Sequence, residues 1–249
     1  MSVDTLSRGK YEVLPVDGTA ASGKGTDAGR LSKELDYPHI DSGSGFRAVT
    51  WALQAGWIKD EDLDDVDSLR KIGLEYREPD GALYIRDLKV GDEIRTSMVS
   101  SEVANVAPRA GVLDYINELV QQFASRNSLV VEGRQMTSHT FKEAPVKYYL
   151  DADIQVRTAR RVKDLTERFG VEPSLESIMA NLEDRDFKDK NRAVQPLRLT
   201  KDTMYLDTSN RTVEECIDLM LDYRHKVHTA IERGEFDLAT WDSRVLSRV

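Results

Sequence analysis

A glycine-rich segment near the N-terminus constrains the fold of this chain more than any other feature. It lies between the mostly apolar residues 11–17 and a helix-like segment, residues 24–35, and it reads Gly18-Thr19-Ala20-Ala21-Ser22-Gly23-Lys24-Gly25-Thr26. A buried strand that runs through such a turn into a helix directs several backbone N–H groups into one concave space, which suits phosphate. The spacing is that of a P-loop. It predicts an α/β fold that binds the phosphates of ATP through the residues of this segment.

Single residues of the loop have separate expected roles. Gly18 and Gly23 allow the tight turn, because a Cβ at either position would block it. Lys24 is expected to bind the terminal phosphates of ATP, and Thr26 is expected to bind Mg²⁺. Gly25 between them makes the sequence GKGT, a variant similar to that of nucleoside monophosphate kinases. The alternative interpretation is a glycine-rich turn with an incidental lysine.

The composition argues against several classes of protein. A chain of 249 residues can form one α/β domain with a large insertion, or two lobes. Its 44 acidic and 35 basic residues argue against a broad nucleic-acid-binding surface. Because no apolar run could span a bilayer and no signal-peptide core is present, we expect a soluble, cytoplasmic protein without a membrane partner. A single cysteine, Cys216, excludes a disulfide framework and a cysteine metal cage.

Five short apolar runs predict the strands of the core. Helical lengths separate most of them, a pattern typical of parallel strands that are buried on both faces. The runs are residues 11–17, 37–40, 128–132, 146–151 and 204–207. Pro15 lies in the first run and lacks an N–H group, so we expect irregular pairing there.

Residues 43–125 interrupt this pattern and are predicted to form an insertion. The sequence indicates helices near 46–53, 60–78, 96–106 and 109–125, with a short strand at 82–86. The P-loop core is then expected at 11–42 and 126–231. It includes charged helices around Arg157 and over 174–192, and a last helix over 213–231. Residues 1–10 and 232–249 are expected to be terminal extensions.

Polar residues follow several predicted strands at the point where each strand ends. They are Gly18–Thr26, Asp41-Ser42-Gly43, Glu132-Gly133-Arg134 and Asp151. Ligands collect at the carboxyl edge of such sheets, so these groups are expected to form one site. Glu132 is the expected acid that orients Mg²⁺-bound water across from Thr26. The alternative is that Glu132 only closes a strand in solvent.

A charged helix near residue 190 adds a candidate anion site. Arg185, Asp189 and Arg192 occur at positions i, i+4 and i+7, so they line one stripe of a helix. Two guanidinium groups can bind a phosphate, and a carboxylate between them can accept from ribose hydroxyls. The stripe alone also fits a solvated helix face with ordinary ion pairs.

The sequence resembles cytidylate kinases over roughly residues 11–230. The matching stretches are Asp17-Gly18, Gly23-Lys24-Gly25-Thr26, Asp41-Ser42-Gly43 with Arg47, Glu93-Ile94-Arg95-Thr96, Gly133-Arg134, Ala144-Pro145-Val146-Lys147, Leu150-Asp151-Ala152, Arg157 with Arg160-Arg161, and Arg185-Asp186 with Asp189 and Asn191-Arg192-Ala193. The resemblance implies a three-layer fold like that of P-loop nucleoside monophosphate kinases, with a parallel five-stranded core sheet. It also implies a monophosphate-binding insertion and a short lid at about 157–192. The implied reaction transfers the γ-phosphoryl group of MgATP to CMP or dCMP.

The resemblance assigns expected roles to residues. The implied catalytic residues are Lys24, Arg157, Arg161 and Arg192. The implied substrate-binding residues are Ser42, Phe46, Arg47, Arg109, Arg134, Gln135, Arg185, Asp189 and Arg192. Three of these depart from the family pattern: Gln135 replaces an aspartate, Phe46 replaces a tyrosine, and Arg109 is one position out of register. All three lie on the acceptor side.

Two alternatives remain open at this stage. One keeps the chemistry and changes the acceptor to another pyrimidine or a modified nucleotide. The other is a nucleotide-binding module without turnover. For the enzyme we expect ATP, CMP or dCMP and Mg²⁺ as partners, a monomeric chain and no nucleic-acid partner.

Overall fold

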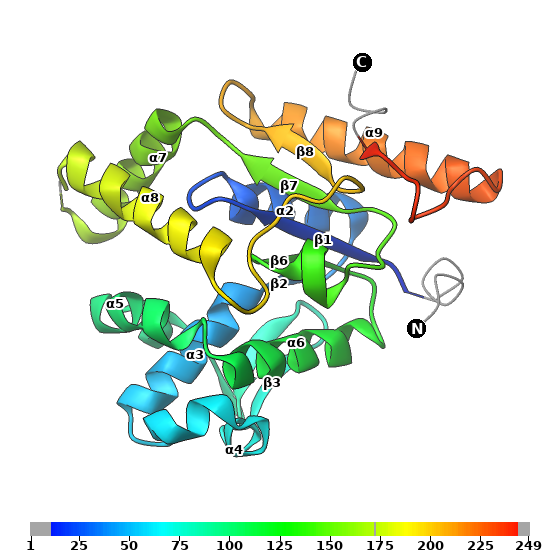
Figure 1. Ribbon diagram of the computed structural model, residues 1–249. Coiled ribbons are helices and arrows are strands. Elements are labelled where there is room, and N and C mark those ends of the chain that lie inside the picture. Colours follow the sequence, from blue (N-terminus) through cyan, green and yellow to red (C-terminus); the bar gives the residue numbers. More distant parts are fainter. Residues whose placement is uncertain (1–10, 172, 244–249) are drawn as a thin grey trace.

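Five parallel strands form the central sheet of the computed structural model, which describes residues 11–171 and 173–243 (Figure 1). The strands lie in the order β2-β6-β1-β7-β8, and all neighbours are parallel. Their bounds are β1 (Val13–Gly18), β2 (His39–Asp41), β6 (Leu129–Glu132), β7 (Tyr148–Asp151) and β8 (Met204–Asp207). Each of the five predicted runs therefore overlaps a strand of one sheet.

Helices cover both faces of this sheet, which gives three layers (Figure 1). On one face α2 (Lys24–Leu35) and α9 (Val213–Glu232) pack against apolar side chains that include Leu14 and Tyr148. On the other face α3 (Ser42–Gln54) and α6 (Ala110–Ala124) pack against Ile40 and Val131. Burial on both faces explains why the strands are almost continuously apolar rather than alternating. The predicted α/β fold is confirmed.

Pro15 lies in β1, the central strand. Pairing of β1 with β6 is regular from Val13 to Val16 and includes Pro15 opposite Val131. Pairing with β7 begins only at Val16, one residue after the proline. The register with β6 is regular despite the missing N–H group of Pro15, and pairing with β7 begins at Tyr148, the first residue of β7, so the expected irregular pairing at Pro15 is not observed.

The segment between β2 and β6 forms a lobe below the sheet with its own small antiparallel sheet (Figure 1). The elements that follow α3 are η1 (Asp60–Asp64), α4 (Val66–Arg70), β3 (Leu74–Arg77), β4 (Ala82–Ile85), β5 (Leu88–Lys89), η2 (Asp92–Arg95), α5 (Ser97–Val106) and α6. The predicted helix over 60–78 is wrong. Gly73 has φ +74° and ends the helical stretch, and Leu74 and Tyr76 then pair with Ile85 and Leu83. The alternating burial of Leu74 and Tyr76 is strand periodicity.

Two helices after β7 pack against each other beside the P-loop. They are α7 (Ile154–Phe169) and α8 (Leu175–Asn191). Ile178 and Leu182 of α8 are buried together with Ala20 of the P-loop. These apolar contacts fix the charged helix α8 next to the glycine-rich turn, so its remaining faces can carry polar groups toward the site.

The ends of the chain are described only in part. Of the predicted extensions, residues 1–10 and 244–249 lie outside the described residues. Phe236 and Trp241 of the C-terminal segment are in ring contact, with centroids 4.7 Å apart, and both pack against the core that α9 forms with the sheet. Among the helices described, none combines the length and the apolar character needed to cross a lipid bilayer.

An ion-pair cluster joins α9 to the start of β1, on the opposite edge of the sheet from the P-loop. Arg224 donates to Glu12 through Nε and Nη2, with a shortest distance of 2.7 Å, and His228 Nε2 lies 2.7 Å from the same carboxylate. Tyr37 donates its hydroxyl hydrogen to Glu12 at 3.0 Å. Burial by itself would raise the pKa of Glu12, but the bonds from His228 and Arg224 outweigh it and lower the pKa to about 2.

This cluster predicts a specific pH dependence of stability. The lowered pKa of Glu12 favours the folded state above its unfolded value of 4.5, and the gain is lost as the pH falls toward about 2. We expect Glu12→Gln to lower the free energy of unfolding by up to about 3 kcal/mol at pH 7, with the difference closing at acid pH. Urea unfolding of both proteins between pH 3 and 7 measures this, with Glu235→Gln as an exposed control. A difference independent of pH would contradict the assignment.

Candidate active site

The P-loop turns sharply because glycine occupies its two critical positions. Gly18 has φ +149°, and a Cβ placed there would lie 1.9 Å from the carbonyl oxygen of Leu150 on β7. Gly23 has φ +96° and directly precedes α2. Since both conformations favour glycine, the loop passes close to β7 and then enters α2 with its first N–H groups facing the turn. The helix N-terminus is a site suited to phosphate.

Lys24, at the first position of α2, bends back over the loop. Its Nζ donates to the carbonyl oxygen of Thr19 at 2.8 Å, and the residue is only 5% exposed. Burial, followed by the positive charge of Arg134, lowers the pKa of Lys24 to about 7. The ammonium group is therefore poorly compensated without an anion, which is the electrostatic condition of a group that binds phosphate.

Acidic residues surround the loop at the ends of β6 and β7. Thr19 Oγ1 donates to Asp151 Oδ1 at 2.5 Å, which joins the loop to the end of β7. Ser42 Oγ donates to the carbonyl oxygen of Glu132 at 2.7 Å, which joins the ends of β2 and β6. The predicted gathering of these strand ends at one edge is therefore observed.

The donor set suits Mg²⁺ bound together with nucleotide phosphates. Thr26 is exposed on the first turn of α2, and a Cβ at the neighbouring Gly25 would lie 3.1 Å from Glu132 Oε1. Burial alone would raise the pKa of Glu132, but His39 and Lys24 outweigh it, lower the pKa and favour the carboxylate. Among the described residues no three His, Cys, Asp or Glu side chains form a metal cluster. A hydroxyl and a carboxylate beside a phosphate site fit Mg²⁺, which takes few protein ligands and completes its shell with phosphate and water.

An arginine cluster lies where the sequence predicts the acceptor site. Arg134 follows β6 and donates from Nε to Asp189 Oδ2 of α8 at 3.0 Å. Arg185, one turn earlier on α8, keeps part of its side chain exposed to solvent, while neighbouring protein atoms desolvate its guanidinium group. The charge of Arg134, together with burial, lowers the pKa of Arg185 to about 10. Arg134 and Arg185 also lower the pKa of Lys24, so the cluster and the P-loop form one continuous positive region.

Arg192 lies directly after α8, as its C-terminal capping residue. Its Nε donates to the carbonyl oxygen of Gln195 at 2.7 Å, and its Nη2 donates to Gln135 Oε1 at 3.3 Å and also to Gln195. Gln135 is 1% exposed. Its Nε2 is a buried donor that has no hydrogen-bond partner within the described residues. Arg192 and Gln135 therefore form one unit at the end of α8.

Two further predicted site residues, Arg47 and Arg161, lie near this cluster but donate hydrogen bonds to neighbours outside it. Arg47 of α3 and Arg161 of α7 both lower the pKa of Arg185 through their charge. Arg47 Nη1 donates to Ser100 Oγ at 2.9 Å, and Arg161 Nη1 donates to Asp164 Oδ2 of its own helix at 2.7 Å. Their guanidinium groups are half-buried at the margin of the positive region.

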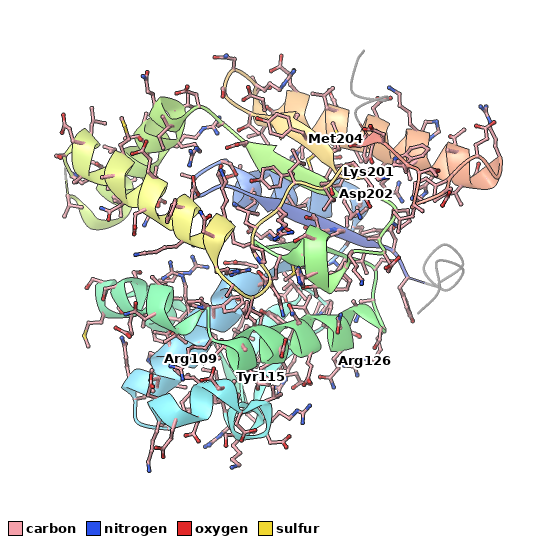
Figure 2. All side chains as sticks on the ribbon, in the orientation of Figure 1. Arg109, Tyr115, Arg126, Lys201, Asp202 and Met204 are labelled. Atoms are coloured by element: carbon pink, nitrogen blue, oxygen red, sulfur yellow. The ribbon has the colours of Figure 1, made fainter. Side chains whose placement is uncertain are left out.

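Three predicted site residues make other contacts. Arg157 is 7% exposed and binds Ala152, Ala20 and Asp186. Arg109 lies at the start of α6 (Figure 2), where Asp64 and Asp60 bind its guanidinium group. Phe46 is buried in the core between α3 and the sheet. The structure does not bring Arg109 or Phe46 into the arginine cluster, and it places Arg157 under the P-loop.

Comparison with known proteins agrees with this geometry. The family model described as cytidylate kinase matches residues 14–226, which include the P-loop, the arginine cluster and both sheets. The chain belongs to the cytidylate kinase family. The resemblance seen in the sequence is thereby confirmed.

Individual relatives in the cytidylate kinase family are about one-third identical to this chain. A cytidylate kinase of Ralstonia pickettii is 34% identical over 91% of this chain and 97% of its own length. A cytidylate kinase of Fervidobacterium nodosum is 33% identical over 84% of this chain and 94% of its own length. A bifunctional pantoate ligase/cytidylate kinase of Trichormus variabilis is 31% identical over 88% of this chain. This chain spans only 42% of that bifunctional protein.

Sequence reasoning missed the contacts of Asp17 and Asp186, although both residues lie in stretches that resemble the cytidylate kinase family. Asp17 is fully buried and accepts from the N–H groups of Met136 and Thr137 in the π-helix η3 (Met136–Thr140). Burial raises the pKa of Asp17, and the bonds from Thr137 and Met136 partly oppose this. Asp186 accepts from the N–H group of Ala20 at 2.8 Å. The only sequence signal for these contacts was an acidic residue at the end of an apolar run, for Asp17, or within a charged helix, for Asp186.

Proposed function

We propose that the protein transfers the γ-phosphoryl group of MgATP to CMP or dCMP and releases ADP with CDP or dCDP. The observation that carries the proposal is the continuity of two anion sites in a chain of the cytidylate kinase family. Lys24 lies on the P-loop, and Arg134 and Arg185 are close enough to shift its pKa. A donor phosphate and an acceptor phosphate bound there would be neighbours, as in-line transfer requires.

The proposed donor site consists of the P-loop residues from Gly18 to Thr26. The N–H groups at the start of α2 and the ammonium group of Lys24 would bind the β- and γ-phosphates. Thr26 and Glu132 would hold Mg²⁺, Glu132 through water. The bound ion would neutralise phosphate charge as the γ-phosphoryl group leaves.

The proposed acceptor site lies between α3, α8 and the end of β6. Arg134, Arg185 and Arg192 would bind the phosphate of the acceptor, and Asp189 would accept from its ribose or deoxyribose hydroxyl. Ser42, Arg47 and Gln135 border the same region. Arg161 would reach the transferred phosphoryl group once its side chain leaves Asp164. The nucleophile would be a phosphate oxygen of the acceptor, which is already ionised. The reaction therefore needs orientation and charge neutralisation rather than a strong general base.

The same proposal assigns the parts of the chain. Residues 11–42 and 126–231 would form the P-loop core, residues 43–125 the monophosphate-binding insertion, and the region of about 157–192 the lid. A cytoplasmic, monomeric enzyme stays a prediction from the sequence.

Phosphorylation of a panel of acceptors tests the proposal. ADP release is measured with MgATP and CMP, dCMP, UMP, dTMP, AMP or GMP in parallel. We expect CMP and dCMP to give the highest kcat/KM, because the family supports a cytidine monophosphate acceptor; the arginine cluster supplies cations for its phosphate. A preference for another acceptor would indicate that the region of Gln135 selects a different base. If ATP binds but no acceptor reacts, the binding-module alternative is favoured.

A further inference from the structure

Asp186 of α8 and Arg157 of α7 form a buried ion pair against the P-loop. Arg157 Nη1 donates to Asp186 Oδ2 at 2.5 Å, and the two residues are 7% and 6% exposed. The pair binds both backbone groups of one P-loop residue. Asp186 Oδ1 accepts from the N–H group of Ala20 at 2.8 Å, and Arg157 Nη1 donates to the carbonyl oxygen of Ala20 at 3.1 Å.

Arg157 is itself fixed to the end of the sheet. Its Nε donates at 2.9 Å to the carbonyl oxygen of Ala152, the first residue after β7. A buried carboxylate is costly unless charged and neutral donors satisfy it, and here the guanidinium group and a backbone N–H group do so. The two side chains are therefore fixed in one arrangement, which connects β7, the P-loop and α8.

The positions of α8 next to Asp186 carry the proposed acceptor residues. Arg185 immediately precedes Asp186, and Asp189 follows one turn later and accepts from Arg134 at 3.0 Å. A shift of α8 relative to the P-loop would thus move Asp186, Arg185 and Asp189 together. The P-loop is the proposed donor site, so the Asp186–Ala20 bond is a direct connection between the two substrate sites.

We infer that Asp186 is a positioning residue, and that the Asp186–Arg157 pair couples nucleotide binding at the P-loop to acceptor binding at α8. The inference rests on the proposed function for the identity of the two sites. A nucleotide that orders the P-loop restrains Ala20, and through Ala20 it restrains α8 with Arg185 and Asp189. Because coupling is reciprocal, an acceptor bound at α8 tightens nucleotide binding by the same factor.

The expected effect is a loss of coupling rather than a loss of either site. The Kd of CMP is measured by calorimetry with and without a saturating non-hydrolysable MgATP analogue. We expect the analogue to tighten CMP binding about fivefold or more in the unmodified protein. In Asp186→Ala the ratio of the two Kd values should fall to about one, while the analogue still binds.

A variant on the same helix provides the matched control. Asp184 pairs with Lys188 at 2.7 Å on the exposed side of α8, where the two side chains are 58% and 61% exposed. Asp184→Ala should keep the ratio of the unmodified protein. If Asp186→Ala does not fold, Asp186→Asn replaces it, since an amide keeps an acceptor for Ala20 and removes the charge opposite Arg157. Its ratio should fall between one and that of the unmodified protein.

Hydrogen exchange separates this inference from the choice of acceptor. If no CMP or dCMP binds, the proposed function has failed, and the coupling is measured by exchange in residues 175–191 with and without ADP. Slower exchange on ADP addition in the unmodified protein and in Asp184→Ala, but not in Asp186→Ala, supports the inference. Coupling or protection that is equal in a folded Asp186→Ala variant, or absent from the unmodified protein, overturns it.

Discussion

Replacing Lys24 with alanine is expected to lower kcat by about 10²–10³-fold or more, which is the cost of removing one group that stabilises developing charge. The ammonium group lies over the P-loop, 2.8 Å from the carbonyl oxygen of Thr19, and no other lysine is placed there among the described residues. Steady-state kinetics with MgATP and the preferred acceptor measures the effect.

Stability separates this effect from misfolding. Burial and Arg134 disfavour the charged form of Lys24 and lower its pKa to about 7, so the group destabilises the folded state fully below about pH 7 and progressively less as the pH rises toward the ordinary value of 10.5. Lys24→Ala should therefore unfold at the same temperature as the unmodified protein or at a higher one. Lys33→Ala, on the exposed side of the same helix, is the matched control and should keep full turnover. A kcat of Lys24→Ala within a factor of about three would contradict the proposed role.

Replacing Gly18 with alanine should have the largest effect on stability. A Cβ at this position would lie 1.9 Å from the carbonyl oxygen of Leu150, and φ is +149°. The methyl group meets backbone of the adjacent central strand, which cannot move without breaking the pairing of β1 and β7. We expect a loss of about 4 kcal/mol or more, measured by urea unfolding of the soluble protein.

A second glycine measures the penalty of an ordinary left-handed residue without a clash. Gly56 also has positive φ, +73°, but a Cβ there would have no atom within 4 Å. Gly56→Ala should cost about 1–2 kcal/mol, the ordinary penalty of a left-handed residue. If Gly18→Ala costs no more than Gly56→Ala, the close approach to β7 is not rigid.

The sequence predicted the parts of the fold whose signals are local. Each core strand is a short apolar run ended by a polar residue, and the P-loop has a fixed spacing, so neither needs knowledge of distant residues. The helix predicted at 60–78 failed because it was extended past Gly73 into Leu74 and Tyr76, whose spacing of two positions is that of a strand but is too short a pattern to stand out. Their burial depends on pairing with β4, which periodicity alone does not specify.

The sequence predicted where most site residues lie in the fold better than it predicted which side chains they bind. The polar groups at the strand ends were expected at one edge of the sheet, and they lie there. Arg109, however, is bound by Asp60 and Asp64, which are more than 40 positions earlier in the chain. Arg157 was expected to act on the transferred phosphoryl group, but it is buried with Asp186 from the next helix. Charge pairs between elements depend on how helices pack, and no pattern within one helix encodes this.

The arginine cluster has a cost for the protein when it is alone. Arg134 lowers the pKa of both Arg185 and Lys24, so these like charges disfavour one another in the folded protein. The phosphate groups of bound substrates would offset this repulsion between the cations. Under the proposed function, bound nucleotides would therefore stabilise the folded protein, and the form without nucleotide would be the less stable one.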